Sequence, residues 1–272
     1  VIGNQGKNFC VGLNLAMALM EAQDENWFEL DMLAKKFHNT VNRIRTMPRP
    51  VVAAPFGMTL GGGVEICYMA DQVQVAAETY LGFVEVGVGV LPGACGTKEM
   101  LFRAMENIPS GTPTPVDAFP FVARAFETIA MAKVSTSGKE AIKLGYMRPT
   151  DRVSINQDHL LYDAKQAVLE LDKRGYTAPV ERRIPAIGTT GFASLRQNIY
   201  GLRESGMISE HDELIATKIA YIMSGGDVPA GTQVNETYIL ELERQGFLEL
   251  IKTQKTQQRM QHMLAKGKPL RN

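Results

Sequence analysis

The sequence has 272 residues, enough for one large domain or for a domain with a substantial appendage. Hydrophobic residues make up 45% of it, which is ample for a folded core, and no apolar run approaches the roughly eighteen residues of a membrane span. The 29 basic and 29 acidic residues balance, so charge gives no argument for binding to nucleic acid or to an anionic membrane.

The first residues read as the end of a strand, because Val1 and Ile2 precede turn chemistry at Gly3 to Gly6. No basic leader of a signal peptide is visible, and a start without Met inside a strand leads us to expect a fragment of a longer protein. A helix with apolar residues at helical spacing is expected over 27–46, ended by Pro48.

Residues 50–97 form the centre of the pattern. A buried strand is expected over 51–55, and three glycines, Gly61 to Gly63, precede a helix over 64–70. Glycines before a helix let the backbone pass close to a ligand, and the N–H groups of the first turn point outward. That arrangement suits an oxygen that becomes anionic during a reaction. Glu65 lies just inside this helix, a strand is expected over 72–75, and a second acid, Glu85, follows twenty residues after Glu65.

Helices are expected next over 98–105, 116–131 and 158–173, and the Pro-rich and Gly-rich stretch 107–115 is expected to be an inserted loop. Ser137 and Glu140 fit a capping box for a short helix that stops at Gly145. After residue 180 we expect a linker, containing 182–185 and 188–191, and then three helices. These helices cover 193–205, 211–224 and 235–265, the last broken near Gly246, and Ser209 with Asp212 would start the second.

Four blocks of this sequence resemble the crotonase (enoyl-CoA hydratase/isomerase) superfamily in residues, order and spacing. They are Phe9–Asn14, Gly61–Glu65, Phe83–Glu85 and Leu91–Thr97. The resemblance implies an α/β fold, a crotonase-like ββα spiral core over 1–180 whose N-terminal strands are missing, with a helical C-terminal extension over 181–272. More narrowly, the chain resembles the hydratase-like part of bacterial multifunctional fatty-acid oxidation proteins that carry a 3-hydroxyacyl-CoA dehydrogenase unit.

By this resemblance the protein is expected to be an enoyl-CoA hydratase, a lyase of fatty-acid β-oxidation. The backbone N–H groups of Leu13 and Gly62 would form the oxyanion hole, Glu65 would orient or deprotonate water, and Glu85 would protonate Cα. Contacts with the CoA thioester are expected at Cys10, Val11, Gly12, Gly61 and Gly63. The sequence has Leu13-Asn14 where many members have Ala-Asp, which puts the substrate range in doubt more than the reaction type.

Simpler interpretations stand beside these. Glu65 could merely stabilise a helix start, by about 0.3–1 kcal/mol, and Glu85 could be a solvated loop residue. The reaction could be that of a Δ3,Δ2-enoyl-CoA isomerase, which needs mainly one carboxylate, or the chain could be a non-catalytic acyl-CoA-binding or docking module. A crotonase-like protein is also expected to form a homo-oligomer, of the trimer type, or to associate with a fused dehydrogenase domain.

Other signals predict structural roles. The glycines of 87–93 do not form a dinucleotide fingerprint, so we expect no cofactor on this chain, with NAD only in a fused dehydrogenase unit, and no metal. The four histidines, His38, His159, His211 and His262, are expected at surface or cap positions. The three cysteines, Cys10, Cys67 and Cys95, lack metal-type spacing and favour a reducing compartment, the cytoplasm, with the last two as packing residues. The basic residues Lys252, Lys255 and Arg259 are expected on a solvated face, with contact to CoA phosphates as the alternative.

Overall fold

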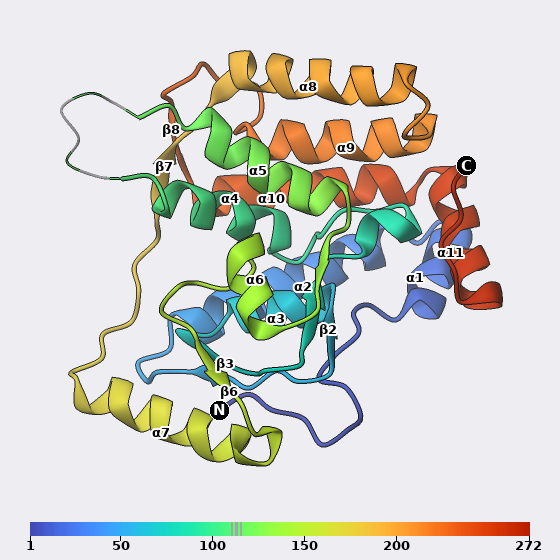
Figure 1. The fold of residues 1–272 in the computed structure, drawn as a ribbon. Helices are drawn as coiled ribbons and strands as arrows, with labels where there is room; N and C mark the ends of the chain where they lie inside the picture. Colours follow the sequence, from blue (N-terminus) through green and yellow to red (C-terminus); the bar gives the residue numbers. More distant parts are fainter. Residues whose placement is uncertain (110, 112–113, 115) are drawn as a thin grey trace. The chain divides into compact units, whose positions relative to one another are not determined.

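The computed structural model describes residues 1–109, 111, 114 and 116–272, so part of the expected loop over 107–115 lies outside the described residues. The contacts divide the chain into two compact units (Figure 1). Unit 1 consists of 1–13, 35–84 and 133–180; unit 2 consists of 14–34, 85–132 and 181–272. Each unit is therefore built from three separate stretches of chain, and helix α2 (Trp27–Arg45) is divided between them.

Unit 1 contains a parallel three-stranded sheet in the order β1-β3-β6. Its strands are β1 (Val52–Ala53), β3 (Gln72–Ala76) and β6 (Arg152–Ser154), with Val52 paired to Gln72 and Val75 to Val153. Ile2 adds a parallel bridge to Ala53, donating to the Val52 carbonyl at 2.8 Å. The strands expected at 51–55 and 72–75 are thus present, the first shortened to 52–53, whereas the strand end expected at 1–2 is only an isolated bridge at Ile2. The run of buried residues along β3 agrees with a strand covered on both faces.

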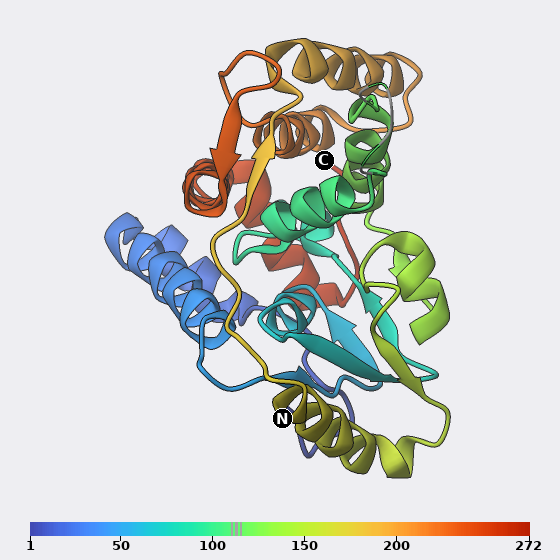
Figure 2. The ribbon, with the colours of Figure 1, turned by 90° about the vertical axis from the view of Figure 1, so that its left-hand side faces the viewer.

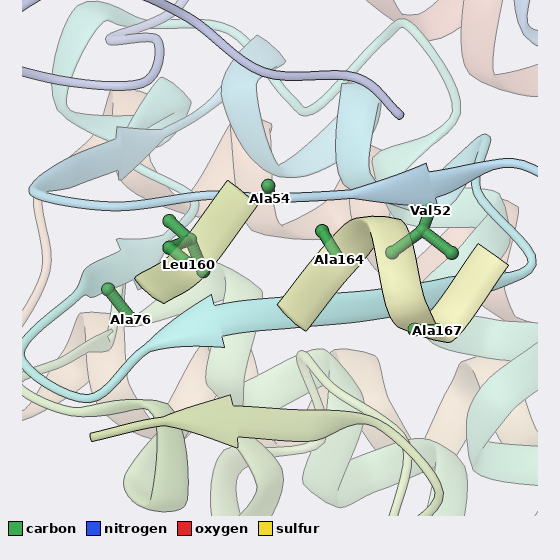
Figure 3. Close-up of a cluster of buried hydrophobic side chains, with 6 residues drawn as sticks. All are labelled: Val52, Ala54, Ala76, Leu160, Ala164 and Ala167. Carbon is green, nitrogen blue, oxygen red and sulfur yellow. The ribbon is translucent and has the colours of Figure 1, made fainter. Parts of the chain in front are cut away.

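Helix α7 (Leu160–Lys173) covers one face of this sheet and places small side chains against it (Figure 3). Ala164 and Ala167 are fully buried against Val52, Ala54 and Ala76. Alanine at these positions lets the helix backbone approach the strands closely without leaving a void. The helix expected over 158–173 is confirmed, with a short 3₁₀ turn, η2 (Gln157–His159), before it.

A second sheet of unit 1 has the order β2-β4-β5. Strands β2 (Met58–Leu60) and β4 (Tyr80–Gly82) are parallel, and β5 (Val134–Ser135) pairs antiparallel with β4. Helices α3 (Gly62–Tyr68) and α6 (Gly138–Leu144) pack beside these strands. The Ser137 hydroxyl accepts the Glu140 N–H as expected, but the Glu140 carboxylate accepts the N–H of Thr136 rather than that of Ser137.

Unit 2 is mostly helical. Its helices are α1 (Leu15–Gln23), the first part of α2, α4 (Gly96–Glu106), α5 (Phe119–Ala130), α8 (Gly188–Glu204), α9 (Glu210–Met223), α10 (Glu236–Ile251) and α11 (Gln254–Lys266), with a 3₁₀ helix, η1 (Glu85–Val88). Helix α9 packs against α4, α5, α8 and α10, and is the centre of this bundle. Figure 2 shows the antiparallel ribbon of β7 (Arg183–Pro185) and β8 (Gln233–Asn235) beside it.

Two expectations for the C-terminal part are wrong. The stretches 182–185 and 188–191 are not a linker, because the first contains β7 and the second begins α8. The last helix breaks at Lys252 and Thr253 rather than at Gly246. Gly246 lies within α10. A Cβ at this position would lie 3.0 Å from the Leu91 side chain and 3.1 Å from the Ile222 side chain, so any larger residue would crowd both. Packing therefore explains this glycine, and a helix break does not.

Segment 181–183 is held in unit 2 by buried charges. Arg182 Nη2 lies 2.6 Å from Glu99 Oε1 and 2.5 Å from Glu236 Oε1. Lys98 Nζ lies 2.5 Å from the same Glu99 oxygen, and its backbone N–H donates to Glu243 at 2.7 Å. Burial opposes the charge of Arg182, but the nearby carboxylates of Glu99 and Glu236 outweigh it and raise the pKa of Arg182. The network fixes the chain at the point where the sequence suggested a linker.

Several polar residues are more buried than the sequence suggests. His38 and His211 are buried, not at the surface, and Arg259 is fully buried rather than on a solvated face. Lys255 pairs with Glu210 at 2.6 Å, and the Lys252 ammonium lies over the Trp27 ring at 5.4 Å from its centroid. Helical spacing groups the three basic residues correctly, but the tertiary contacts give each a different environment. Among the helices described here, none is both long and apolar enough to cross a membrane.

The burial of His211 generates a pH prediction. Burial, together with Arg259 and Lys255, lowers the pKa of His211 from 6.5 to about 4, against the opposing effect of Asp212 and Glu210. Between these pH values the unfolded chain binds a proton at His211 that the folded chain does not, so the free energy of unfolding rises with pH. The slope from one proton is at most about 1.4 kcal/mol per pH unit.

Replacing His211→Gln keeps a donor near the position of Nε2 and removes the titration. We expect the difference in unfolding free energy between wild type and variant to shrink as the pH falls from 6.5 toward 4, measured by urea denaturation. A difference that stays constant over this range would contradict the assignment.

Candidate active site

The loop 10–13 of unit 1 lies beside the start of α3. Cys10 forms a parallel bridge with Thr59, donating to the Met58 carbonyl at 3.3 Å and accepting from the Leu60 N–H at 2.9 Å. The chain leaves β2 at Leu60 and passes directly into Gly61, the N-cap of α3. Pairing with β2 therefore brings the loop of the first family block next to the glycine triplet of the second.

The glycines allow a very close approach at this place. A Cβ at Gly63 would lie 2.4 Å from the Cys10 carbonyl oxygen and 3.0 Å from the Cys10 Cβ. Gly61 has φ 54° and Gly12 has φ 104°, backbone conformations that side chains disfavour. A Cβ at Gly12 would be 3.7 Å from the Gly62 nitrogen. The two segments are thus in backbone contact, and glycine is required on both sides.

Two backbone N–H groups at this contact are available to a ligand. Within the part of the chain that the structure describes, the N–H groups of Leu13 and Gly62 have no hydrogen-bond partner. The N–H of Gly61, by contrast, donates to the Gly82 carbonyl at 2.9 Å. Because Gly62 begins α3, its N–H also points out of the first turn of a helix. Both N–H groups that the sequence assigns to the oxyanion hole are therefore free to bind a ligand, and the oxyanion hole itself stays a prediction.

Glu65 lies in the first turn of α3 and is 3% exposed. The position of a Cβ on Gly62 would be 3.8 Å from Glu65 Oε2, so the carboxyl group turns back toward the N-terminus of its own helix. It is therefore close to the Gly62 N–H, where a proton acceptor could act on a molecule held by that donor. The same location also favours a negative charge through the helix dipole. A carboxylate at Glu65 can therefore stabilise the start of α3 and also serve as a proton acceptor.

Glu85 is the first residue of η1 in unit 2 and is half-buried. It directly follows β4 and the two residues Phe83 and Val84 of unit 1. Phe83 is buried and packs edge-to-face against Tyr68 and Tyr146, with ring centroids 6.0 and 5.6 Å away. The carbonyl of Glu85 accepts the Val90 N–H at 3.1 Å, which closes the turn. Glu85 therefore lies in a 3₁₀ turn and is half-buried, unlike the solvated loop residue of the simpler interpretation, and its catalytic role stays a prediction.

The remaining site predictions have different outcomes in the geometry. The structure brings Cys10 and Gly12 into contact with the glycine triplet, and Leu13 follows directly in the same loop, all within unit 1. Val11 and Leu13 have exposed side chains, whereas Gly63 is buried against Cys10 and serves close packing. The contacts with CoA stay predictions. Asn14 begins unit 2, and its side chain caps α1 by accepting the Met17 N–H at 3.2 Å, a structural reason for asparagine here.

Two supporting residues were missed from the sequence. Gly82 accepts the Gly61 N–H, and a Cβ on it would lie 2.6 Å from the Lys133 carbonyl oxygen. The Asn8 side chain accepts the Met58 N–H at 3.0 Å and so helps to fix the loop beside β2. Neither has a sequence signal of its own, since both act through chain segments far away in sequence.

Among the described residues no cluster of His, Cys, Asp and Glu could hold a metal ion. All three cysteines are thiols, and Cys67 and Cys95 are buried.

Gly63→Ala tests the close contact. We expect it to lower the free energy of unfolding by about 1–3 kcal/mol, the usual penalty of overpacking, and to displace the Cys10–Leu13 loop from α3. Gly201→Ala is the matched control, because a Cβ in that helix meets nothing within 4 Å, and it should stabilise by about 0.5–1 kcal/mol. Urea denaturation measures both, and equal stability of the two variants would rule out the steric argument.

Comparison with known proteins shows which family and fold this chain resembles. Residues 1–107 match the family described as enoyl-CoA hydratase/isomerase. Over all 272 residues the chain is 52% identical to a Bacillus subtilis (strain 168) protein named "Probable 3-hydroxyacyl-CoA dehydrogenase", of which it spans 34%. It is 30% identical over 151 residues to a "Probable enoyl-CoA hydratase" of the same organism, covering 53% of this chain and 48% of that protein.

The fold has solved counterparts. The crystal structure of an enoyl-CoA hydratase from Rhodobacter sphaeroides 2.4.1 matches with a TM-score of 0.61 and 15% identity, covering 99% of this chain and 77% of that one. At that identity the likeness shows the fold alone. The family match supports an activity of the hydratase/isomerase type. Residues 1–107 therefore resemble the enoyl-CoA hydratase/isomerase, or crotonase, superfamily, and the chain has a crotonase-type α/β fold with a helical C-terminal part.

Proposed function

We propose that the chain is an enoyl-CoA hydratase of fatty-acid β-oxidation, which adds water syn across the double bond of a 2-enoyl-CoA to give a 3-hydroxyacyl-CoA. One observation carries the proposal: the N–H groups of Leu13 and Gly62 lack partners among the described residues, and the Glu65 carboxyl group lies beside Gly62. Hydrogen-bond donors and a proton acceptor are the two components that addition of water to an activated double bond requires.

In this proposal the two N–H donors stabilise the negative charge that forms during the reaction. When the oxygen of water bonds to Cβ, the electron pair of the double bond moves toward the thioester, and its oxygen becomes an enolate. Two preorganised N–H groups stabilise that charge without rearranging, and one such donor is commonly worth about 3–4 kcal/mol. The thioester oxygen would accept from Leu13 and Gly62, and CoA would lie along Cys10, Val11, Gly12, Gly61 and Gly63.

The two glutamates complete the proton balance in this proposal. Glu65 accepts the proton that water loses as the O–Cβ bond forms, and Glu85 donates a proton to Cα as the enolate collapses. An isomerase needs mainly one carboxylate to move a proton from one carbon to another. The presence of both acids in the family positions favours the hydratase, while isomerase activity is the second candidate. The large Leu13 side chain, exposed beside the donors, is a candidate for limiting the acyl group.

We also propose that the chain is part of a multifunctional protein. It spans 34% of its relative named as a 3-hydroxyacyl-CoA dehydrogenase. A dehydrogenase unit that uses NAD would consume the 3-hydroxyacyl-CoA that hydration produces. Oxidation of 3-hydroxyacyl-CoA by the parent protein, followed by NADH absorbance, tests this arrangement.

Gly62→Pro removes the donor at Gly62 while keeping the helix start, because proline is tolerated at the first position of a helix. We expect kcat for crotonyl-CoA hydration to fall by about 10²–10³, the usual effect of losing one oxyanion donor. Gly62→Ala is the control: it retains the N–H, and its Cβ meets its neighbours at ordinary distances of 3.6 Å or more. If both variants lose activity equally, the N–H of Gly62 is not the donor.

Glu65→Gln and Glu85→Gln separate the candidate functions. We expect each to lower hydration of crotonyl-CoA by about 10²–10⁴, the range for loss of a general acid or base, measured by loss of enoyl-thioester absorbance. Both variants are also assayed with a 3-enoyl-CoA. Isomerisation that survives in Glu65→Gln, without hydration in wild type, would favour the isomerase. Calorimetric binding of a CoA thioester with no turnover would favour a binding module. The parent protein is assayed in parallel to decide whether this chain is active by itself.

A further inference from the structure

The 3₁₀ turn that carries Glu85 is bound by the C-terminal helix of the same unit. Arg259 of α11 is fully buried, and its Nη1 donates to the Val86 carbonyl at 3.1 Å. Thr256, one turn earlier and also fully buried, donates its hydroxyl to the Gly89 carbonyl at 2.6 Å. Two carbonyls of the turn that begins at Glu85 therefore depend on side chains about 170 residues later in the sequence, which lie in the same unit.

Each of these donors is itself fixed. The Thr256 hydroxyl has a single proton, which goes to Gly89, so the contact of its oxygen with His211 Nε2 at 2.9 Å makes that nitrogen the donor. Arg259 Nη1 also lies 2.7 Å from Asp212 Oδ1, and its Nη2 donates to the Ser209 hydroxyl at 3.1 Å. Ser209 and Asp212 form the capping box of α9, so the start of α9 holds Arg259 in place.

The backbone of the turn is in close contact with Thr256. Gly89 has φ 91°, and a Cβ on it would lie 2.8 Å from both the Cα and the Oγ1 of Thr256. Inside the turn, the Val90 N–H donates to the Glu85 carbonyl and the Gly89 N–H to the Val86 carbonyl, each at 3.1 Å. The dihedral angles of residues 85–89 are thus restrained both within the turn and by α11, and they set the direction in which the Glu85 side chain leaves the backbone.

Packing alone does not explain this choice of residues. Burying an arginine carries a large desolvation penalty, and apolar residues of similar volume fill such space at least as well. Burial opposes ionisation of Asp212, yet the hydrogen bond from Arg259 lowers the pKa of Asp212, so this carboxyl group is charged at neutral pH. What the charged pair and Thr256 supply, and apolar side chains would not, is directional hydrogen bonds to the Val86 and Gly89 carbonyls.

We propose that Arg259 and Thr256 are positioning residues that hold the turn 85–89, and with it the Glu85 carboxyl group, in its working orientation. The proposal rests on the proposed catalytic role of Glu85. It assigns a function to part of the long C-terminal extension. In this proposal α11 and the start of α9 support the turn that carries Glu85, the proposed proton donor. A small displacement of a catalytic group can lower a rate by about 10²-fold, which makes such support consequential.

Thr256→Val tests the restraint directly, with Thr256→Ser as the matched control that keeps the hydroxyl. Hydrogen–deuterium exchange of the peptide covering 83–91 reports on the Gly89 and Val90 amides that close the turn. We expect faster exchange in Thr256→Val and in Arg259→Lys, and wild-type exchange in Thr256→Ser. Ile199→Val, a buried change in α8, controls for a general loss of stability, with melting temperatures recorded for all variants. Unchanged exchange in Thr256→Val would overturn the proposal whatever its activity.

Crotonyl-CoA kinetics then test the consequence. In Thr256→Val we expect kcat to fall by about 10-fold or more with KM little changed, and Thr256→Ser to restore it. In a Glu85→Gln background Thr256→Val should have no further effect, because residues that act through one another are not additive. An additive loss in that background would show a merely structural role and overturn the proposal. If neither the wild-type chain nor the parent protein turns over crotonyl-CoA, the proposed function is overturned. The hydrogen–deuterium exchange comparison still decides whether α11 holds the turn.

Discussion

The candidate site depends on the contact between the Cys10 carbonyl and the backbone at Gly63, where a Cβ would lie only 2.4 Å from the oxygen. Two other constraints follow from it. The loop 10–13 must pair with β2 to reach this position, and α3 must begin immediately after β2. Because the contact is between backbones, the N–H groups at its edge are placed by the fold and do not rely on flexible side chains. The oxyanion site proposed for Leu13 and Gly62 would require preorganisation of this kind.

A similar use of glycine recurs at two other close contacts. Gly82 lies against the Lys133 carbonyl in unit 1, and Gly89 lies against Thr256 in unit 2. Each glycine flanks a residue or segment that the proposed chemistry uses: Gly82 accepts from Gly61, and Gly89 closes the turn that begins at Glu85. The glycines thus do more than provide turns. They let distant segments support the short, irregular pieces of backbone that carry the site.

Buried charge supplies the second kind of support, and it is concentrated in unit 2. Arg182 joins Glu99 and Glu236, and Arg259 joins Asp212 to the turn 85–89. Such pairs add little net stability compared with apolar packing, but they have directional partners and so specify one arrangement of the helices. A bundle whose helices could slide against one another would not hold a 3₁₀ turn in a fixed orientation. The need to specify one arrangement of the helices accounts for the buried charged residues of the C-terminal part, which the sequence pattern predicts to be a simple helical extension.

Local sequence patterns determined most elements of this protein. Alternation, helical spacing and capping residues predicted β3, α2, α7 and the start of α9, and the glycine triplet predicted the helix that begins there, because these signals act over a few neighbouring residues. The tertiary structure alone decided the rest. Gly246 continues a helix, the expected linker is a strand and a helix start, and Arg259 is buried beneath Glu85's turn. In each case the deciding partner is far away in sequence, and no local pattern encodes such a partner.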